Sequence, residues 1–298
     1  MKLGKELMLA KKRDIEQVLA SIGIAFMEWA KPLLQVENVE LPTQIIKLLE
    51  DFSDVFPEEL PKGLPSIRGI EHQIDLVSGA SLINRPAYRC TLEGAKEIQR
   101  QVGELLEKGY MRESLNPCFV PTLLLPKKDG TMWMCVDSRE INKITIKYQF
   151  PIPRLDDLVY ELHGLALFSK IDLMSGYHHI RMNEGGEWKT TFKTKHRKWL
   201  VMPFGLSNEP STFIRLRNHV FWKHIGLFVV VYFDDVLVFS RTFDDHVEHP
   251  KALFETLRDA KLYGKLKKCH LYQESVVFFG YIISSSGIKV DEENVKNN

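Results

Sequence analysis

The sequence has few cysteines, little net charge and no long apolar run, and each absence excludes a class of protein. Its cysteines, Cys90, Cys118, Cys135 and Cys269, lie far apart without a C-x-x-C pair. This spacing argues against a structural zinc site or a disulfide framework and fits a reducing compartment. No apolar run approaches the length of a membrane span, and the N-terminus lacks a signal-peptide pattern.

The overall composition is that of an ordinary globular protein. The chain has 298 residues, of which 44% are hydrophobic and 27% are charged. This length permits one large unit or two smaller ones. Because the formal net charge is only +1, the chain as a whole is not a basic nucleic-acid binder, and any contact with nucleic acid has to be a local patch.

The most informative stretch is Val229–Ser240, where Asp234 and Asp235 stand between two short apolar runs. Each run is typical of a buried strand, and Asp-Asp favours a turn, so the stretch predicts a tight hairpin with both carboxylates at its tip. Two like charges held so close repel each other unless a cation lies between them, and a hard divalent ion such as Mg²⁺ suits that place. Taken alone, the stretch is equally compatible with an ordinary turn that carries solvated Asp residues.

A second predicted strand, Leu167–Asp172, ends in a third Asp. Its alternation places Phe168 and Lys170 on the same face as Asp172. Three carboxylates at strand ends, one distant in sequence and two adjacent, predict a two-metal site for phosphoryl transfer.

These motifs resemble those of reverse transcriptases from the Gag-Pol polyproteins of gypsy-class LTR retrotransposons. Tyr232–Asp235 is similar to the family's Y-x-D-D box, and Phe168–His178 is similar to its upstream catalytic box. Further motifs follow in the family's order at Phe56–Pro61, Val136–Lys143, Val201–Leu206 and Leu266–Cys269. The resemblance runs from about Phe52 to Val295. It implies an RNA-directed DNA polymerase, a nucleotidyltransferase that adds deoxynucleotides to a primer on an RNA or DNA template.

The expected fold class is α+β, with an antiparallel sheet backed by helices. Apolar spacing predicts helices at 43–52, 91–108, 154–163, 210–224 and 244–262, and strands at 70–76, 119–125, 132–136, 179–182, 190–195 and 275–283. The resemblance implies the fingers and palm of a right-hand polymerase with the thumb largely missing. Residues 1–55 would be a helical linker between protease and polymerase, residues 56–298 the polymerase, with fingers at about 85–150 and palm at about 151–298.

The resemblance also implies roles for single residues. Asp172 and Asp234 would bridge two Mg²⁺ ions, for which Mn²⁺ is a possible substitute. Asp235 would be a weaker ligand, and the backbone carbonyl of Leu173 would complete one shell. The nucleotide would be bound by Lys127, Lys128, Trp133, Tyr177, Phe204, Gly205 and Lys268, and the primer grip would be Phe279, Gly280 and Tyr281.

Two of these roles have simpler alternatives. Tyr177 would be the steric gate that leaves no room for a 2′-hydroxyl, but it also fits an ordinary buried Tyr. Lys127 and Lys128 also fit two solvated lysines in a turn.

The charged residues after the strand at 132–136 predict that Asp137 and Arg139 pair and brace the fingers.

The expected partners are a primed RNA or DNA template and deoxynucleoside triphosphates, with no membrane partner. The family implies a cytoplasmic virus-like particle, and the sequence leaves the oligomeric state open. The main alternative function is a decayed, non-catalytic retrotransposon fragment that has the same fold and at most binds nucleic acid. A nuclease would need a water-positioning base, and none is evident in the sequence.

Three departures from the family's pattern support the decayed alternative. Trp133 stands where the family usually has an Arg, and Glu209 replaces a small Ala next to the expected template pocket. Pro250 is expected to interrupt a helix, because Pro in a helix interior costs roughly 3 kcal/mol.

Overall fold

The structure is a computed structural model that describes residues 41–81, 84–114, 119–126, 130–151, 162, 164–193, 197–232, 235–278 and 281–290. The described chain divides into two compact units. The first holds residues 61–149 and 177–212, and the second holds residues 36–60, 150–176 and 213–298. Both contain helices and antiparallel strands, so the expected α+β class is confirmed. Apart from residue 162, the expected helix at 154–163 lies outside the described residues.

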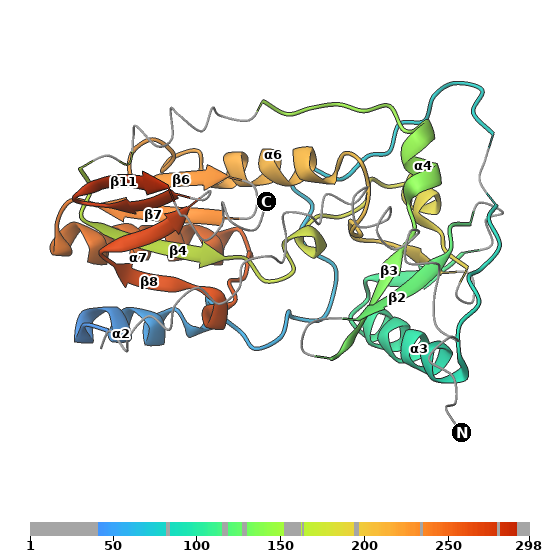
Figure 1. The fold of residues 1–298 in the computed structure, drawn as a ribbon, viewed down its shortest axis with the longest axis horizontal. Helices are drawn as coiled ribbons and strands as arrows, with labels where there is room; N and C mark the ends of the chain where they lie inside the picture. Colours follow the sequence, from blue (N-terminus) through green and yellow to red (C-terminus); the bar gives the residue numbers. More distant parts are fainter. Residues whose placement is uncertain are drawn as a thin grey trace. The chain divides into compact units, whose positions relative to one another are not determined.

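The second unit is built on a four-stranded antiparallel sheet in the order β6-β7-β4-β8 (Figure 1). The strands are β4 Leu167–Asp172, β6 Val229–Tyr232, β7 Asp235–Ser240 and β8 His270–Gln273. β6 and β7 form the hairpin that the sequence predicts, with Tyr232 opposite Asp235. The sequence did not indicate β8, whose pairing with β4 shifts register between Phe168 and Lys170.

One face of this sheet is covered by a small second sheet, made of β9 Ser275–Phe278, β10 Tyr281–Ser284 and β11 Gly287–Val290. The apolar cluster between the two sheets consists of Leu162, Leu165, Phe168, Val230, Leu237, Phe239, Val276, Phe278 and Ile283. The prediction of one strand at 275–283 is wrong, because β9 and β10 are separate strands that pair antiparallel with Phe278 opposite Tyr281. The apolar run continues through the connection between them, so periodicity alone did not reveal it.

Helix α7 (Phe243–Asp259) contacts β4 and β7. The hydroxyl of Thr242 caps it by accepting a hydrogen bond from the Asp245 N–H at 3.2 Å. The helix continues through Pro250, so the expected interruption is wrong. The side chains of Leu253 and Phe254 are fully buried. Burial of such side chains contributes about 1.5–3 kcal/mol each, which offsets the roughly 3 kcal/mol cost of an internal proline.

The second unit also contains shorter helices around this core. Helix α2 (Thr43–Asp51) and the 3-10 helix η2 (Ser53–Val55) both contact α7. The Phe52 ring lies 5.7 Å from that of Phe254. The 3-10 helix η5 (Leu266–Lys268) precedes β8. Helix α6 (Glu209–Phe221) begins in the first unit and continues into the second.

In the first unit, helix α3 (Leu92–Glu107) lies beside the hairpin of β2 (Thr122–Pro126) and β3 (Met132–Val136) (Figure 1). Thr91 caps the helix by accepting the Gly94 N–H at 3.0 Å, and Gly109 follows it with a φ of 77°. The predicted helix at 91–108 and the predicted strands at 119–125 and 132–136 are therefore confirmed. The hairpin turn, including Lys127 and Lys128, lies outside the described residues.

The rest of the first unit is made of short elements. These are β1 Met111–Glu113, which pairs with β5 Arg197–Trp199, helix α4 Arg139–Ile144, and the 3-10 helices η3 Gly176–His179 and η4 Glu187–Thr190. The strands predicted at 70–76, 179–182 and 190–195 are wrong, because the described residues there form only isolated bridges and 3-10 turns. Their alternation reflects side chains that turn inward from loops, such as Ile74 and Phe192. No helix among the described residues is long and apolar enough to cross a membrane.

A buried polar network joins α7 to the sheet of the second unit. His246 is fully buried. Its Nε2 lies 2.8 Å from the hydroxyl of Ser169 on β4, and its Nδ1 lies 2.9 Å from the hydroxyl of Ser240 on β7. Burial, with a smaller contribution from the nearby His249, lowers the pKa of His246 from 6.5 to about 4. The imidazole is therefore neutral in the folded protein.

This network predicts acid sensitivity. Between pH 6.5 and about 4 the unfolded chain binds the His246 proton and the folded chain does not, so the free energy of unfolding falls as pH falls through this window. Above pH 6.5 the stabilisation is fully present. The slope for one such group is at most about 1.4 kcal/mol per pH unit. Urea unfolding of the unaltered chain and of His246→Gln at several pH values should show a shallower slope for the variant. Identical slopes would contradict the assignment.

Candidate active site

Two of the three predicted catalytic carboxylates lie at the same end of the second unit's sheet. β4 ends at Asp172 and β7 begins at Asp235, and these two residues are directly opposite each other in the antiparallel pairing. Directly opposed side chains project from the same face of a sheet with Cβ atoms about 4.5–5.5 Å apart. The third carboxylate, Asp234, lies outside the described residues. Asp172 and Asp235 are both half-buried.

The backbone at Asp172 is held by a segment that precedes β8. We call residues 263–269 the strap. The Lys265 N–H donates to the Asp172 carbonyl at 2.8 Å, and the Met174 N–H donates to the Tyr263 carbonyl at 2.8 Å. The Asp172 N–H in turn points at the Sγ of Cys269, 3.5 Å away. Burial raises the pKa of the Cys269 thiol to about 12, so it stays protonated beside the carboxylate.

This pairing determines the direction of the next peptide group. Leu173 and Gly264 form an antiparallel bridge in which the residues on either side of them make the hydrogen bonds. Successive peptide groups of an extended chain point to opposite sides. The carbonyl of Leu173 therefore points away from the strap and toward the side on which β7 pairs. This is the direction that the predicted metal-ligand role of Leu173 requires.

The N-terminal part of the second unit binds and packs against the strap. The Gly264 N–H donates to the Val55 carbonyl at 2.9 Å, and a Cβ on Gly264 would lie only 2.5 Å from the ring of Phe56. The Phe56 ring meets that of Phe254 edge-on at 5.0 Å. The Phe-Pro motif at 56–57 thus has a structural role, because Phe56 packs against the strap that binds the end of β4 at Asp172.

After Asp172 the chain turns sharply. Ser175 has a φ of 47°, which an L-residue adopts only under constraint. A Cβ on Gly176 would lie 2.4 Å from the ring of Phe213. Only glycine permits this close approach, which accounts for the Ser-Gly pair that follows the catalytic strand.

The arrangement is suited to a hard divalent cation. Asp172 and Asp235 present carboxylate oxygens on one face, with Asp234 adjacent in sequence, and such oxygens are the ligands that Mg²⁺ prefers. Among the described residues no group of three or more His, Cys, Asp or Glu side chains has the spacing of a metal site. One cation is already present, because the Lys170 ammonium lies 2.7 Å from an Asp235 oxygen.

Three predicted nucleotide-binding residues lie together in the first unit. The ring of Phe204 meets Trp133 edge-on at 5.6 Å and Tyr177 at 4.8 Å. Tyr177 is 8% exposed. The peptide of Gly205 is held by the Asn142 side chain, which donates to the Gly205 carbonyl at 2.8 Å.

Trp133 and Phe204 also line a cavity of about 330 Å³ within the first unit. Gln101 of α3 forms part of its wall and binds the backbone of β3 on both sides of Trp133. Its side-chain amide donates to the Met132 carbonyl at 2.8 Å and accepts the Met134 N–H at 3.0 Å. These bonds fix the edge of the strand that presents Trp133.

Comparison with known proteins identifies the chain. A sequence profile described as "Reverse transcriptase (RNA-dependent DNA polymerase)" matches residues 125–283. The chain belongs to the reverse transcriptase family. The Pol polyprotein of transposon 297 from Drosophila melanogaster is 37% identical over 266 residues, which is 87% of this chain and 25% of that protein. The Tf2-3 polyprotein of Schizosaccharomyces pombe is 31% identical over 88% of this chain and 20% of its own length.

These relatives confirm the assignment to an LTR retrotransposon reverse transcriptase. The gypsy class fits these Pol polyproteins. The chain spans about a fifth to a quarter of their length. Solved structures agree on the fold. The foamy viral protease-reverse transcriptase with an RNA/DNA hybrid has a TM-score of 0.75 and 21% identity over 99% of this chain and 38% of that one. Members of the family generally use divalent metal ions.

The remaining predicted site residues divide into two groups. Lys268 is exposed in η5, and Tyr281 begins β10. Lys127, Lys128, Phe279 and Gly280 lie outside the described residues. Sequence reasoning singled out Leu266–Cys269 as a motif but missed the pairing of the strap with Asp172 and Met174, because no local pattern marks a backbone that pairs across the fold. It also missed Lys170 as a partner of Asp235, although its alternation with Asp172 was a usable signal.

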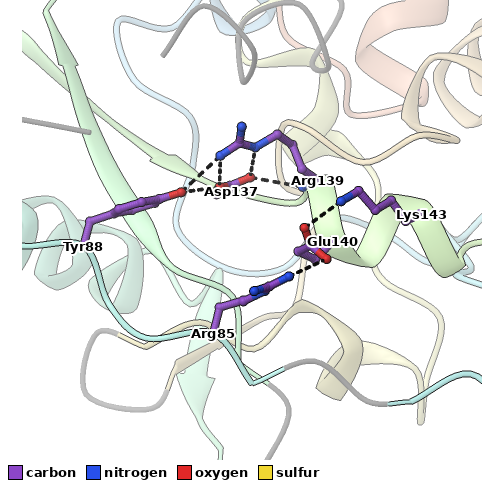
Figure 2. Close-up of polar contacts among 6 residues, drawn as sticks. All are labelled: Arg85, Tyr88, Asp137, Arg139, Glu140 and Lys143. Carbon is purple, nitrogen blue, oxygen red and sulfur yellow. Dashed lines mark hydrogen bonds and ion pairs between the residues drawn. The ribbon is translucent and has the colours of Figure 1, made fainter. Parts of the chain in front are cut away.

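The predicted brace between Asp137 and Arg139 is present in this reverse transcriptase chain (Figure 2). Arg139 donates from Nε to Asp137 Oδ1 at 2.9 Å and from Nη2 to Oδ2 at 2.8 Å. The Tyr88 hydroxyl donates to Oδ2 at 2.7 Å. Burial alone would raise the pKa of Asp137, but the hydrogen bonds from Arg139 and Tyr88 outweigh it and lower the pKa. The brace links the loop at Tyr88 to the segment that follows β3.

Figure 2 also contains a matched control. Glu140 pairs with Arg85 at 3.1 Å and with Lys143 at 2.8 Å, but these side chains are more exposed. We expect Asp137→Asn to lower the free energy of unfolding by about 1–3 kcal/mol, because it leaves a half-buried guanidinium without its carboxylate. Glu140→Gln should cost less than about 1 kcal/mol. Urea denaturation measures both, and equal losses would show that the brace is no stronger than a surface pair.

Proposed function

We propose that this chain catalyses RNA-directed DNA synthesis, in which a deoxynucleotide is added to the 3′ end of a primer on an RNA or DNA template. The observation that carries the proposal is the register that opposes Asp172 and Asp235 at one end of the β4–β7 pair, in a chain whose family consists of RNA-dependent DNA polymerases. Asp234 directly precedes Asp235 in the sequence.

The carboxylates would hold two divalent ions, with Mg²⁺ the expected metal and Mn²⁺ a substitute. Such ions lower the pKa of the attacking 3′-hydroxyl and stabilise the leaving pyrophosphate. Asp172 and Asp234 would be the shared ligands, and the Leu173 carbonyl a further one. The strap supports this assignment, because its hydrogen bonds to Asp172 and Met174 direct the Leu173 carbonyl away from itself.

The aromatic residues of the first unit would contact the incoming deoxynucleoside triphosphate. Trp133 and Phe204 offer ring surfaces for the base. Tyr177 would act as the steric gate beneath the sugar, a role that its contact with Phe204 supports because a packed ring cannot easily move aside. Gly205 lines the same pocket in this proposal, and the cations of Lys127, Lys128 and Lys268 would face the triphosphate, whose charge grows in the transition state.

The nucleic-acid partner would be a primed template held through its backbone. The structural neighbours include foamy viral enzymes in complex with an RNA/DNA hybrid and with double-stranded DNA. Phe279, Gly280 and Tyr281 would form the primer grip, and β10, which begins at Tyr281, belongs to the small sheet that covers the β6-β7-β4-β8 sheet. We place this activity in the cytoplasm, within a virus-like particle.

The test is extension of a labelled DNA primer on an RNA template with Mg²⁺. We expect slow extension by the unaltered chain, and a further loss of about 10³-fold or more for Asp172→Asn, because several kcal/mol of charge stabilisation at the reacting oxygens is removed. The matched control is Asp259→Asn, at the exposed end of α7, which should leave extension unchanged.

The other outcomes identify other functions. Shortening of the primer would indicate a nuclease. Retention of the primed template without reaction would indicate a decayed fragment that only binds. Equal loss in Asp172→Asn and Asp259→Asn would remove Asp172 from the proposed site.

Substitutions at Trp133 test whether this chain has lost polymerase activity. An Arg in its place would supply a planar cation that can both stack on the base and bind phosphate through two hydrogen bonds, whereas Trp keeps only the ring and one donor. We expect Trp133→Arg to raise the extension rate by up to about 10²–10³-fold. Trp133→Phe keeps a ring without charge and should give no gain. Robust extension by the unaltered chain that Trp133→Arg leaves unchanged would contradict the decayed alternative.

A further inference from the structure

A lysine is paired with a carboxylate of the proposed metal site. The Lys170 Nζ lies 2.7 Å from Asp235 Oδ2, across the β4–β7 pairing. The two residues are not directly opposite, because Lys170 faces Leu237 and Asp172 faces Asp235. The ammonium therefore reaches diagonally along the sheet toward the carboxylate end, past the position that is directly across from it.

The surroundings keep this cation where it is. Deeper on the same face, Phe168, Leu237 and Phe239 belong to the buried apolar cluster. An ammonium is not stable among those side chains, so it has to extend toward the open end of the sheet. On its other side β4 pairs with β8, where Lys170 is opposite the exposed His270. The side chains of Lys170 and Asp235 are 23% and 24% exposed, which weakens solvent screening of the pair compared with a surface pair.

We propose that Lys170 is a built-in counter-cation of the carboxylate cluster, which holds Asp235 and competes with the metal ions for it. This inference rests on the proposed two-metal site. Without metal, the ammonium offsets the repulsion between Asp172 and Asp235 across the strand pair. With metal, it keeps Asp235 engaged, so that Asp235 acts mainly through its charge while the other ligands coordinate. Lys170 is thus a positioning residue that sets how tightly the site binds divalent ions.

The ion pair makes the two opposed carboxylates unequal in their availability to a metal ion. Asp172 and Asp235 are opposite each other in register, yet Lys170 is ion-paired with Asp235. A divalent ion that coordinates Asp235 has to displace the ammonium or share an oxygen with it. Removing the ammonium should therefore favour the metal.

The test measures metal binding without substrate. Mn²⁺ is titrated into the unaltered chain and into Lys170→Met, and bound Mn²⁺ is followed by electron paramagnetic resonance. Even with the screening of bulk water, one unit charge and a divalent ion a few ångströms apart alter binding by about tenfold. We therefore expect Lys170→Met to bind Mn²⁺ about tenfold more tightly.

Two variants serve as controls. Lys170→Arg keeps the charge and should bind Mn²⁺ within about threefold of the unaltered chain. Lys251→Met removes the same charge from an exposed pair with Glu248, 3.9 Å apart on α7, and should change nothing. Equal or weaker binding by a folded Lys170→Met would overturn the inference, because it would mean that Lys170 is indifferent to the metal or assists it.

A second measurement does not depend on the folding of Lys170→Met. In the unaltered chain with ¹³C-methylated lysines, the Lys170 signal is the one that disappears in Lys170→Arg. During a Mg²⁺ titration the chemical shift of this signal should change, with the same midpoint as metal binding. An unchanged chemical shift would overturn the inference. If no variant shows saturable Mn²⁺ binding that Asp172→Asn removes, the metal site fails, and this inference fails with it. Mn²⁺ binding that is the same in all Lys170 variants would contradict this inference but leave the proposed function intact.

Discussion

The opposition of Asp172 and Asp235 across two adjacent strands is the constraint on which the rest of the second unit depends. It places two like charges on one face of a sheet at neighbouring positions, which is unfavourable without a cation. Packing on both faces of the sheet and backbone hydrogen bonds hold the pair in this register. Val230 and Phe239 anchor one face of the sheet in the apolar cluster, α7 packs on the other, and the strap holds the backbone at Asp172. A slip of one residue in register would move Asp172 to the wrong face.

Polar groups reinforce this register from inside. Ser169 lies between Lys170 and Phe168 but points to the opposite face, where it meets His246 and accepts the Tyr272 N–H at 3.0 Å. Its hydroxyl therefore ties β4 to α7 and β8 at once. Because a buried polar group without its partner costs about 1–3 kcal/mol, this bond adds to the apolar contacts in discriminating against any other register. The sheet that carries the carboxylates is thus specified by pairs that tolerate no shift.

Sequence patterns predicted the parts of the fold that depend on local periodicity. Helix α3, the β6–β7 hairpin, the face shared by Lys170 and Asp172 and the pairing of Asp137 with Arg139 were all predicted. The strap was not, because the bonds of Lys265 to Asp172 and of Gly264 to Val55 join segments far apart in sequence. The division of 275–283 into two strands was missed because its apolar run has no break in hydrophobicity. Local rules also failed at Pro250, where tertiary burial outweighs helix propensity.

The three departures from the family's pattern have different physical weight. Pro250 is accommodated inside α7. Glu209 is 2% exposed and accepts the Leu206 N–H at 3.1 Å, so its negative charge lies at the N-terminus of α6, where the helix dipole favours it. Pro250 therefore does not break the helix, and Glu209 has a structural role at the start of α6. Trp133 is different, because its ring keeps the contact with Phe204 while the cation that an Arg would bring is absent. Of the three departures, Trp133 is therefore the one that removes a charge on which the proposed chemistry would draw.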